Sequence, residues 1–264
     1  MNHLQTLTLG LALATAVALV ARRMRTLSGS GAVVATAVGT IVVAAGWSWA
    51  VVLIAYFVSA SILSRFKAAE KESRTGGRLE KGGARDAVQV LANGGLFTLA
   101  AIGYSTSPDP IWQALGAGAL AASAADTWAT ELGTLARAAP RSILDFSPVV
   151  VGTSGGVTAI GFTGAAAGAA SIALVVWLVD WPRLAIAAAL IGGVIGCLLD
   201  SVIGASLQAR RRCPTCLVAT ERRRHGCGSL TTVTGGLRWL DNDGVNALST
   251  IGGALFGATA ASYF

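Results

Sequence analysis

The residues best suited to chemistry are acids and carboxamides that lie inside otherwise apolar segments. An ionisable side chain within a membrane helix is costly, so such a residue is a functional candidate. Carboxylates can hold Mg²⁺ and leave coordination positions for phosphate oxygens. We therefore predict two overlapping sets of residues, one catalytic and one metal-binding. The catalytic set is Asp126, Asn93, Asp200 and Asn246, and the metal-binding set is Asp126, Glu131, Asp200 and Asp243.

The spacing of Asp126 and Glu131 argues against equal roles for the two acids. They are five residues apart, which corresponds to about 140° around a helix of 3.6 residues per turn. In a regular helix their carboxylates do not point to one spot. We expect Asp126 to be the stronger metal candidate, and Glu131 to be solvated near the membrane interface.

A small-residue segment, Gly152 to Gly156, precedes an apolar run. Its glycines allow backbone N–H groups to form an anion-binding nest beside a helix N-terminus. A helix N-cap within a tight turn is the alternative interpretation. Lys81 and Arg85 could neutralise a nucleotide, or could equally anchor the chain at the membrane surface. The predicted nucleotide- and phosphate-binding set is Lys81, Arg85, Gly152, Thr153, Ser154, Gly155, Gly156 and Gln208.

Four residues near the end of the chain have the chemistry of zinc ligands. Cys213-Pro-Thr-Cys216 is a zinc-like half-site, whereas the second half, His225-Gly-Cys227, is less usual. Two interpretations stay open, a structural zinc site and free thiols in a basic loop. Neither interpretation makes this cluster catalytic.

Long apolar segments must position these residues. The 264-residue chain is 53% hydrophobic and 12% charged, with a mean hydropathy of +0.64, whereas soluble domains carry roughly 25% charged residues. A membrane helix needs roughly 20 apolar residues, so spans consume most of the chain. We predict an all-α fold, a polytopic transmembrane helix bundle forming one domain over 1–264. The spans, about eight, are 3–21, 30–46, 48–64, 86–104, 111–136, 155–180, 184–207 and 243–263.

The basic residues predict the orientation of this bundle. Of the 20 Lys and Arg residues, all but Arg183 fall in alternate loops between spans. The positive-inside rule puts those loops in the cytoplasm and both termini outside. The net charge of +7 follows from the same bias, so no nucleic-acid partner is expected. The larger cytoplasmic loops lie near 65–85, 137–154 and 208–242.

This orientation brings the polar residues of four spans to one depth, the cytoplasmic third of the membrane. Scattered structural residues would not be expected to agree in this way, so we predict a shared site rather than unrelated interhelical hydrogen bonds. Carboxylates for a divalent cation beside donors for phosphate are what phosphoryl transfer needs.

Five motifs, in order along the chain, carry a family resemblance. They are Arg85…Gln89-Val-Leu-Ala-Asn93-Gly, Asp126-Thr-Trp-Ala-Thr-Glu131-Leu-Gly133, Gly152-Thr-Ser-Gly-Gly156, Asp200-Ser-Val-Ile-Gly-Ala-Ser-Leu-Gln208 and Asn242-Asp-Gly-Val-Asn246. Together they resemble an integral membrane family that includes plant phytyl-phosphate kinase and animal transmembrane protein 19. The pattern around Asp126 is also similar to dolichol kinases and, more distantly, to membrane cytidylyltransferases. The resemblance implies phosphoryl transfer from a nucleoside triphosphate to an isoprenoid monophosphate, such as phytyl or polyprenyl phosphate, giving the diphosphate.

We therefore expect a multi-pass kinase of the cell membrane whose active site faces the cytoplasm. Mg²⁺ and a nucleoside triphosphate, CTP or ATP, are the expected cofactor and co-substrate. The expected partners are an isoprenoid phosphate lipid and membrane lipids, and self-association into a homo-oligomer stays open. Two alternatives stay open, a CTP-dependent lipid-phosphate cytidylyltransferase that releases pyrophosphate, and a small-solute transporter.

Overall fold

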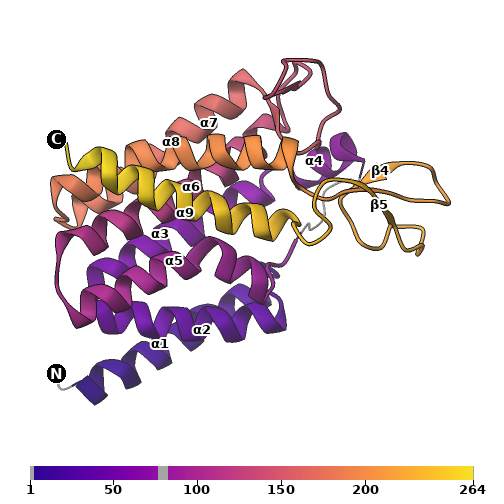
Figure 1. The fold of residues 1–264 in the computed structure, drawn as a ribbon. Coiled ribbons are helices and arrows are strands. Elements are labelled where there is room, and N and C mark those ends of the chain that lie inside the picture. Colours follow the sequence, from indigo (N-terminus) through magenta and orange to yellow (C-terminus); the bar gives the residue numbers. More distant parts are fainter. Residues whose placement is uncertain (1–2, 77–82, 264) are drawn as a thin grey trace.

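A computed structural model describes residues 3–76 and 83–263, and this part of the chain is mainly helical (Figure 1). The fold-class prediction is therefore confirmed. The eight long helices each lie within a few residues of a predicted span. They are α1 (His3–Arg23), α2 (Gly29–Ala45), α3 (Trp47–Arg65), α5 (Ala87–Thr106), α6 (Pro110–Gly133), α7 (Ala159–Leu178), α8 (Arg183–Ser206) and α9 (Asn242–Ala261).

Local sequence explains where several of these helices begin. Asp86 and Gln89 form a capping box at the start of α5, in which each side chain satisfies a backbone N–H. Asp109 caps α6 and is followed by Pro110, whose fixed φ suits the first helical position. Asp241 caps α9 by accepting a hydrogen bond from the Gly244 N–H.

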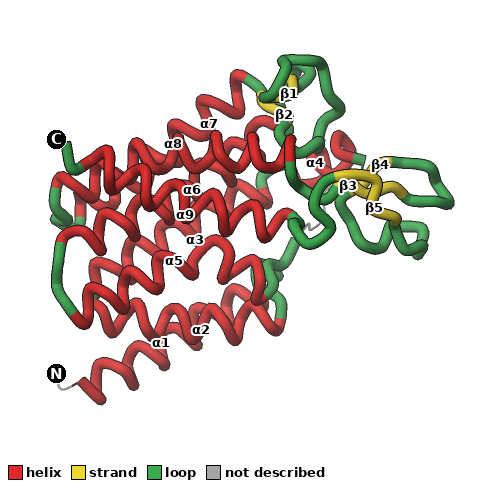
Figure 2. Tube along the Cα trace, in the orientation of Figure 1, coloured by secondary structure: helices red, strands yellow, loops and turns green. Residues whose placement is uncertain are grey.

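Successive long helices run in opposite directions along the bundle (Figure 1). The start of α1 and the end of α9 lie at one end, and the larger loops lie at the other end, which we name the loop end (Figure 2). The short helix α4 (Ala68–Thr75) and five short strands belong to this end. The segments predicted as plain loops therefore contain regular structure.

The strands form two small antiparallel sheets. In the loop between α6 and α7, β1 (Arg141–Ser142) pairs with β2 (Gly156–Val157). Between α8 and α9, β3 (Arg210–Arg212) lies between its neighbours β4 (Ala219–Thr220) and β5 (Thr232–Gly235).

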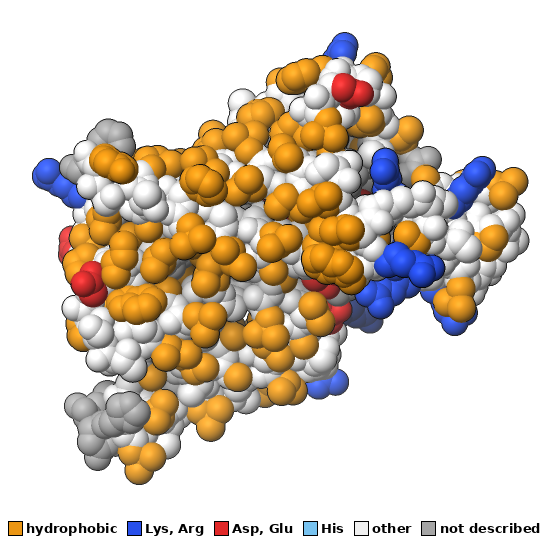
Figure 3. Space-filling model, in the orientation of Figure 1, with side chains coloured by type: hydrophobic (Ala, Val, Ile, Leu, Met, Phe, Trp, Pro, Cys, Tyr) orange, Lys and Arg blue, Asp and Glu red, His pale blue; other side chains and the backbone are white. Residues whose placement is uncertain are grey.

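Five of the helices in the described residues, α1, α3, α5, α7 and α8, are long and apolar enough to cross a membrane. Helix α2 is apolar but shorter, and α6 and α9, which carry several of the polar candidates, fall outside this set. The count of eight spans is therefore not confirmed and stays a prediction. Figure 3 shows hydrophobic side chains over the flank of the bundle and most of the visible lysine and arginine side chains near the loop end.

Helix α6 lies at the centre of the bundle and packs against α7, α8 and α9. Every residue from Gly116 to Ala125 is buried. Glycines let the backbones approach closely, since a Cβ at Gly192 of α8 would lie 2.2 Å from the Gly253 carbonyl oxygen of α9. Such close packing through small residues is typical of membrane helices.

Candidate active site

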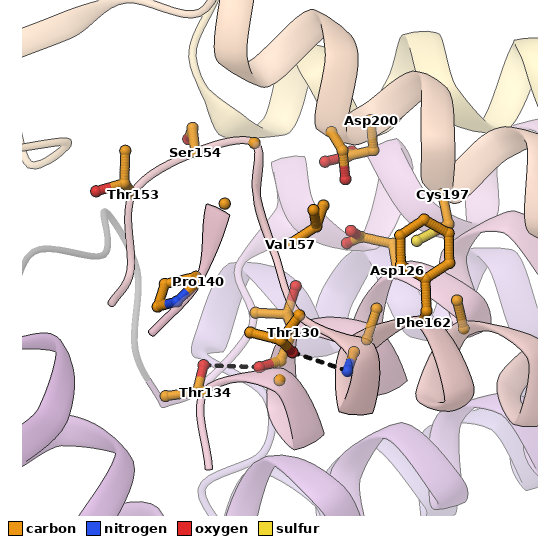
Figure 4. A pocket seen from close by; sticks show the side chains of 18 of the residues that line it. Asp126, Thr130, Thr134, Pro140, Thr153, Ser154, Val157, Phe162, Cys197 and Asp200 are labelled. Atoms are coloured by element: carbon orange, nitrogen blue, oxygen red, sulfur yellow. Dashed lines mark hydrogen bonds between the residues drawn. The ribbon is translucent and has the colours of Figure 1, made fainter. Parts of the chain in front are cut away.

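A cavity of about 150 Å³ opens near the loop end, between α6, α7 and α8. The loop 151–157 forms one wall, Glu221 lines the cavity from the segment before α9, and Asn242 lines it from the first residue of α9. Figure 4 shows Asp126 of α6 and Asp200 of α8 with their carboxylates directed into the same space. The structure thus brings together the two acids to which the sequence gives both a catalytic and a metal role.

Small residues one helical turn away explain why these two acids meet. Ala122 and Gly196 precede Asp126 and Asp200 by four residues each, so they lie on the same helix faces as the acids. A Cβ at Gly196 would lie 2.4 Å from the Cβ of Ala122. The backbones of α6 and α8 therefore approach closely one turn away from the carboxylates.

The electrostatic setting of the two carboxylates favours a bound cation. Both residues are partly buried, and within the described residues no lysine or arginine forms an ion pair with either one. The Oδ2 atom of Asp200 is buried and has no hydrogen-bond partner in this part of the chain. Buried charges are normally paired or coordinate a metal. Mg²⁺ is usually held by one or two carboxylates and keeps its other coordination positions for water or phosphate oxygens, so these two carboxylates are a donor set that fits this ion.

The segment Gly152–Gly156 approaches α8 so closely that a side chain at Gly155 has no room. Gly155 has a φ of +73°, and a Cβ there would lie 2.3 Å from the Cβ of Ala205. The Ser154 hydroxyl lies 3.0 Å from Oε1 of Gln208 and also contacts the Glu221 carboxylate. The N–H groups of Ser154 and Gly155 donate to no acceptor in the described residues. They are therefore available to bind an anion.

The position of this segment relative to α7 differs from the prediction. The sequence predicts a span from residue 155, but Thr158 is the N-cap and α7 begins at Ala159. The glycines instead form a turn that leads into β2. Thr158, the N-cap of α7, also lines the cavity, so the N-terminus of this helix lies beside the cavity.

Two of the predicted site residues line a second cavity instead. This cavity of about 280 Å³ is mainly apolar and lies between α1, α2, α3 and α5. Arg85 and Asn93 line it, together with Gln89. The Arg85 guanidinium donates to Ser61 Oγ at 3.1 Å, and Asn93 Nδ2 donates to the Gln89 carbonyl at 2.9 Å. The structure therefore does not bring these residues to Asp126 and Asp200.

Glu131 lies outside both cavities because it pairs with a lysine of α4. The Lys71 ammonium group contacts the Glu131 carboxylate and also donates to the Leu63 and Ser64 carbonyls at the end of α3. Arg74 of α4 donates to the Thr134 and Ala136 carbonyls after α6. Helix α4 thus joins the ends of α3 and α6, and Glu131 has a structural partner.

The other predicted site residues lie apart from the first cavity. Asp243 is buried in the first turn of α9, and Asn246 lies one turn later, with its carbonyl accepting from the Ser249 hydroxyl. Neither lines the first cavity. Gln208 is buried beside Ser154 and reaches the site through that contact. Lys81 lies outside the described residues.

The polar residues at the cavity that the predicted sets do not contain include Glu221 and Asn242. Glu221 is the sole acid between Gln208 and Leu240, a stretch otherwise rich in arginine. That isolation was the available sequence signal. Asn242 lies within the last of the five motifs, whereas the predicted metal-binding set contains its acidic neighbour, Asp243.

Comparison with known proteins supports the relation to membrane proteins. The chain is 29% identical over 238 residues to Protein PGR of Arabidopsis thaliana, covering 80% of this chain and 81% of that protein. It is 29% identical over 170 residues to the uncharacterized membrane protein MJ0933 of Methanocaldococcus jannaschii, covering 62% and 67% of the two chains. It is 32% identical over 177 residues to the uncharacterized membrane protein sll0875 of Synechocystis, covering 64% and 67%.

No solved structure matches this chain. The model of the family named integral membrane protein DUF92 matches residues 12–254. Together with the apolar helices, this match identifies a multi-pass membrane protein. Because the family model covers most of the sequence, the chain belongs to the DUF92 family of integral membrane proteins.

Proposed function

We propose that this protein is a membrane-embedded kinase that transfers a phosphoryl group from a nucleoside triphosphate to an isoprenoid monophosphate. The observation that carries the proposal is the convergence of Asp126 and Asp200 in a cavity with Ser154 and Gly155 on one wall. Carboxylates for a cation beside backbone donors for phosphate suit phosphoryl transfer. The substrate class comes from the resemblance of the five motifs to the family that includes phytyl-phosphate kinase.

The lining of the cavity suits a lipid with an anionic head. Thr153, Ser154 and Asn242 lie toward the loop end, whereas Phe162 and Val194 belong to the helices that flank the cavity. Phe162 is 47% exposed on the outer surface of α7. A phosphate head can therefore lie among the polar groups while its apolar tail extends between α7 and α8 toward the bilayer.

Asp126 and Asp200 would hold Mg²⁺, which neutralises phosphate charge when bound. The N–H groups of Ser154 and Gly155 would then orient phosphate oxygens at the opposite wall. Gln208 and Glu221 hold the Ser154 hydroxyl and so act as positioning residues.

The reaction needs no general base. An oxygen of the acceptor phosphate is already anionic, and it forms a bond to the γ-phosphorus. The bond between the γ-phosphorus and its bridging oxygen breaks, and the nucleoside diphosphate leaves with that electron pair. The protein's own contribution is orientation and charge stabilisation.

We further propose that the loop end faces the cytoplasm and that the membrane is the cell membrane. The basic loops at this end satisfy the positive-inside rule. Nucleotide, which is soluble in the cytoplasm, would then reach the cavity without crossing the bilayer.

The test is turnover by the full chain purified in detergent. Protein, Mg²⁺, nucleotide labelled in the base and at the γ-phosphate, and phytyl or geranylgeranyl monophosphate are incubated, and the lipid products are separated. A lipid diphosphate carrying the γ-label supports the kinase. Base label joined to the lipid would instead identify a cytidylyltransferase, and flux of solutes in liposomes without turnover would identify a transporter.

Carboxamide variants link the activity to the cavity. Asp126→Asn and Asp200→Asn should each lower the Mg²⁺-dependent rate by more than about 10²-fold, because removal of a metal-binding charge weakens stabilisation of the transferring phosphoryl group. Asp180→Asn is the matched control. Asp180 lies in the turn between α7 and α8, at the end opposite the cavity, and its φ of +55° suits asparagine. A full rate in either cavity variant would remove that acid from the proposed metal site.

A further inference from the structure

Three cysteines and a histidine come together in the segment between α8 and α9. Cys213, Cys216, His225 and Cys227 each offer one ligand atom, and the four atoms lie within 4.8 Å of one another. None of these residues lines the candidate active site. The proximity of all four is an observation independent of the proposed kinase activity.

The spacing of the ligand atoms fits a tetrahedral zinc ion. Zinc bonds of about 2.3 Å to sulfur and about 2.0 Å to nitrogen separate two thiolates by roughly 3.8 Å, and a thiolate from an imidazole nitrogen by roughly 3.5 Å. The Sγ atoms of Cys213 and Cys227 are 3.6 Å apart, and Nδ1 of His225 lies 3.2 Å from Sγ of Cys227. A disulfide needs about 2.05 Å between sulfurs, and all of the cysteines are free.

Two tight turns present these ligands. In the first, the Cys216 N–H donates to Cys213 Sγ at 3.4 Å, and the Leu217 N–H donates to the Cys213 carbonyl at 2.9 Å. In the second, Gly228 adopts a φ of +89° and its N–H donates to the His225 carbonyl at 2.9 Å. Hydrogen bonds from the backbone to a ligating sulfur orient the ligand and support its negative charge.

The surrounding sheet is too small to be stable through its own packing. Its strands β3, β4 and β5 have three, two and four residues, and most of their side chains are at least partly exposed. Leu217 and Leu230 nearby are 63% and 66% exposed, whereas Cys213 is fully buried. Units with so little apolar core usually depend on disulfides or metals.

We propose that Cys213, Cys216, His225 and Cys227 form a structural zinc site that stabilises the β3–β5 sheet. Four protein ligands complete the tetrahedron, so no coordination position is left for a substrate. The site has a further role through β4, which ends at Thr220. The next residue, Glu221, lines the candidate active site and contacts Ser154. Zinc therefore holds one wall of that cavity in place.

The experiment is a metal analysis of the full chain purified in detergent, with elemental mass spectrometry as the readout. We expect about one zinc ion per chain. The Cys213→Ser/Cys216→Ser double variant should contain no zinc. Cys197→Ser is the matched control for metal content, because Cys197 of α8 lines the first cavity and is not part of the cluster, and it should retain zinc. Zinc-free wild-type protein after zinc loading, or undiminished zinc in the double variant, would overturn the proposal.

A second set of measurements separates metal binding from misfolding. His225→Cys keeps four soft ligands and should retain the metal, whereas His225→Ala should lose most of it. Replacement of zinc by Co²⁺ in the wild type should give a thiolate-to-metal absorption band that is absent from the double variant. Chelation of wild-type protein should expose thiols to a colorimetric reagent, and added zinc should protect them again. Equal thiol reactivity with and without zinc would contradict the assignment.

Discussion

Gly196 is one of the glycines that allow the helices carrying Asp126 and Asp200 to approach closely. A Cβ at this position would lie 2.4 Å from the Cβ of Ala122 and 3.0 Å from the carbonyl oxygen of Ser249. Carbon atoms in contact sit about 3.5–4.0 Å apart, so Gly196→Ala must separate α6 and α8 locally by roughly 1–1.5 Å. The two carboxylates, one turn away, should separate by a similar distance.

A displacement of this size should be costly to the reaction. Misplacement of reacting groups by about 1 Å costs on the order of 10²-fold in rate, and Mg²⁺ tolerates little deviation from octahedral geometry. We therefore expect Gly196→Ala to lower kcat/KM for diphosphate formation by about 10²-fold. Overpacking should also lower stability by about 1–3 kcal/mol, which thermal unfolding in the same detergent measures.

Two further variants test this reasoning. Gly95→Ala of α5 is the matched control, because the nearest atom to its added Cβ is the Leu91 Cβ at 4.0 Å. It should keep the wild-type rate. Ala122→Gly in the Gly196→Ala background removes the contacted methyl group and should restore part of the activity. A wild-type rate and melting temperature in Gly196→Ala would refute the idea that this contact fixes the spacing of the acids.

Two other perturbations have expected outcomes. Lys71→Met should lower the free energy of unfolding by about 2 kcal/mol, because it leaves the Glu131 carboxylate without its lysine. Lys67→Met removes only an exposed ion pair with Glu70, so it should change the free energy of unfolding by less than about 1 kcal/mol. Thermal unfolding measures both, and equal effects would contradict the conclusion that Lys71 of α4 joins the ends of α3 and α6. Gly155→Ala should raise KM for nucleotide at least about tenfold, because the added methyl group displaces the loop from α8. Gly76→Ala, which shares the positive φ but has no atom near its Cβ, should leave this KM unchanged, and equal KM values for the two variants would refute a role for the clash.

The long helices could be predicted from the sequence because their signal is apolar length. The expected segments 30–46 and 184–207 differ from α2 and α8 by one residue at each end. The loops could not be predicted in the same way. Helix α4 has a favourable sequence for a helix, but its position depends on Lys71 reaching Glu131, a partner 60 residues away. The strands are too short to show a two-residue periodicity.

Which residues belong to the site was harder to predict from the sequence than where the helices begin and end. The angle between Asp126 and Glu131 correctly indicated that they point in different directions, but it could not show that α5 turns Asn93 toward another cavity. We predict from the sequence that the polar residues of four helices lie at one depth. The sequence does not show, however, how each helix is rotated about its own axis. Only packing supplies that rotation, and for α6 and α8 it includes the close approaches of Ala122 to Gly196 and of Ala121 to Gly193.

The close contact between α6 and α8 at Ala122 and Gly196, which we name the seam, limits how the substrate selectivity of this protein can change. Backbones in such contact leave no volume that a new side chain could occupy or vacate. Under the proposed function, a change in accepted tail length would have to come from α7 and the outward face of α8, where Phe162, Ala165 and Leu198 border the cavity. Substitutions at these positions would change the volume available to a lipid tail without moving Asp126 and Asp200. Relatives that handle lipids of different length should therefore differ at these positions and keep small residues along the seam.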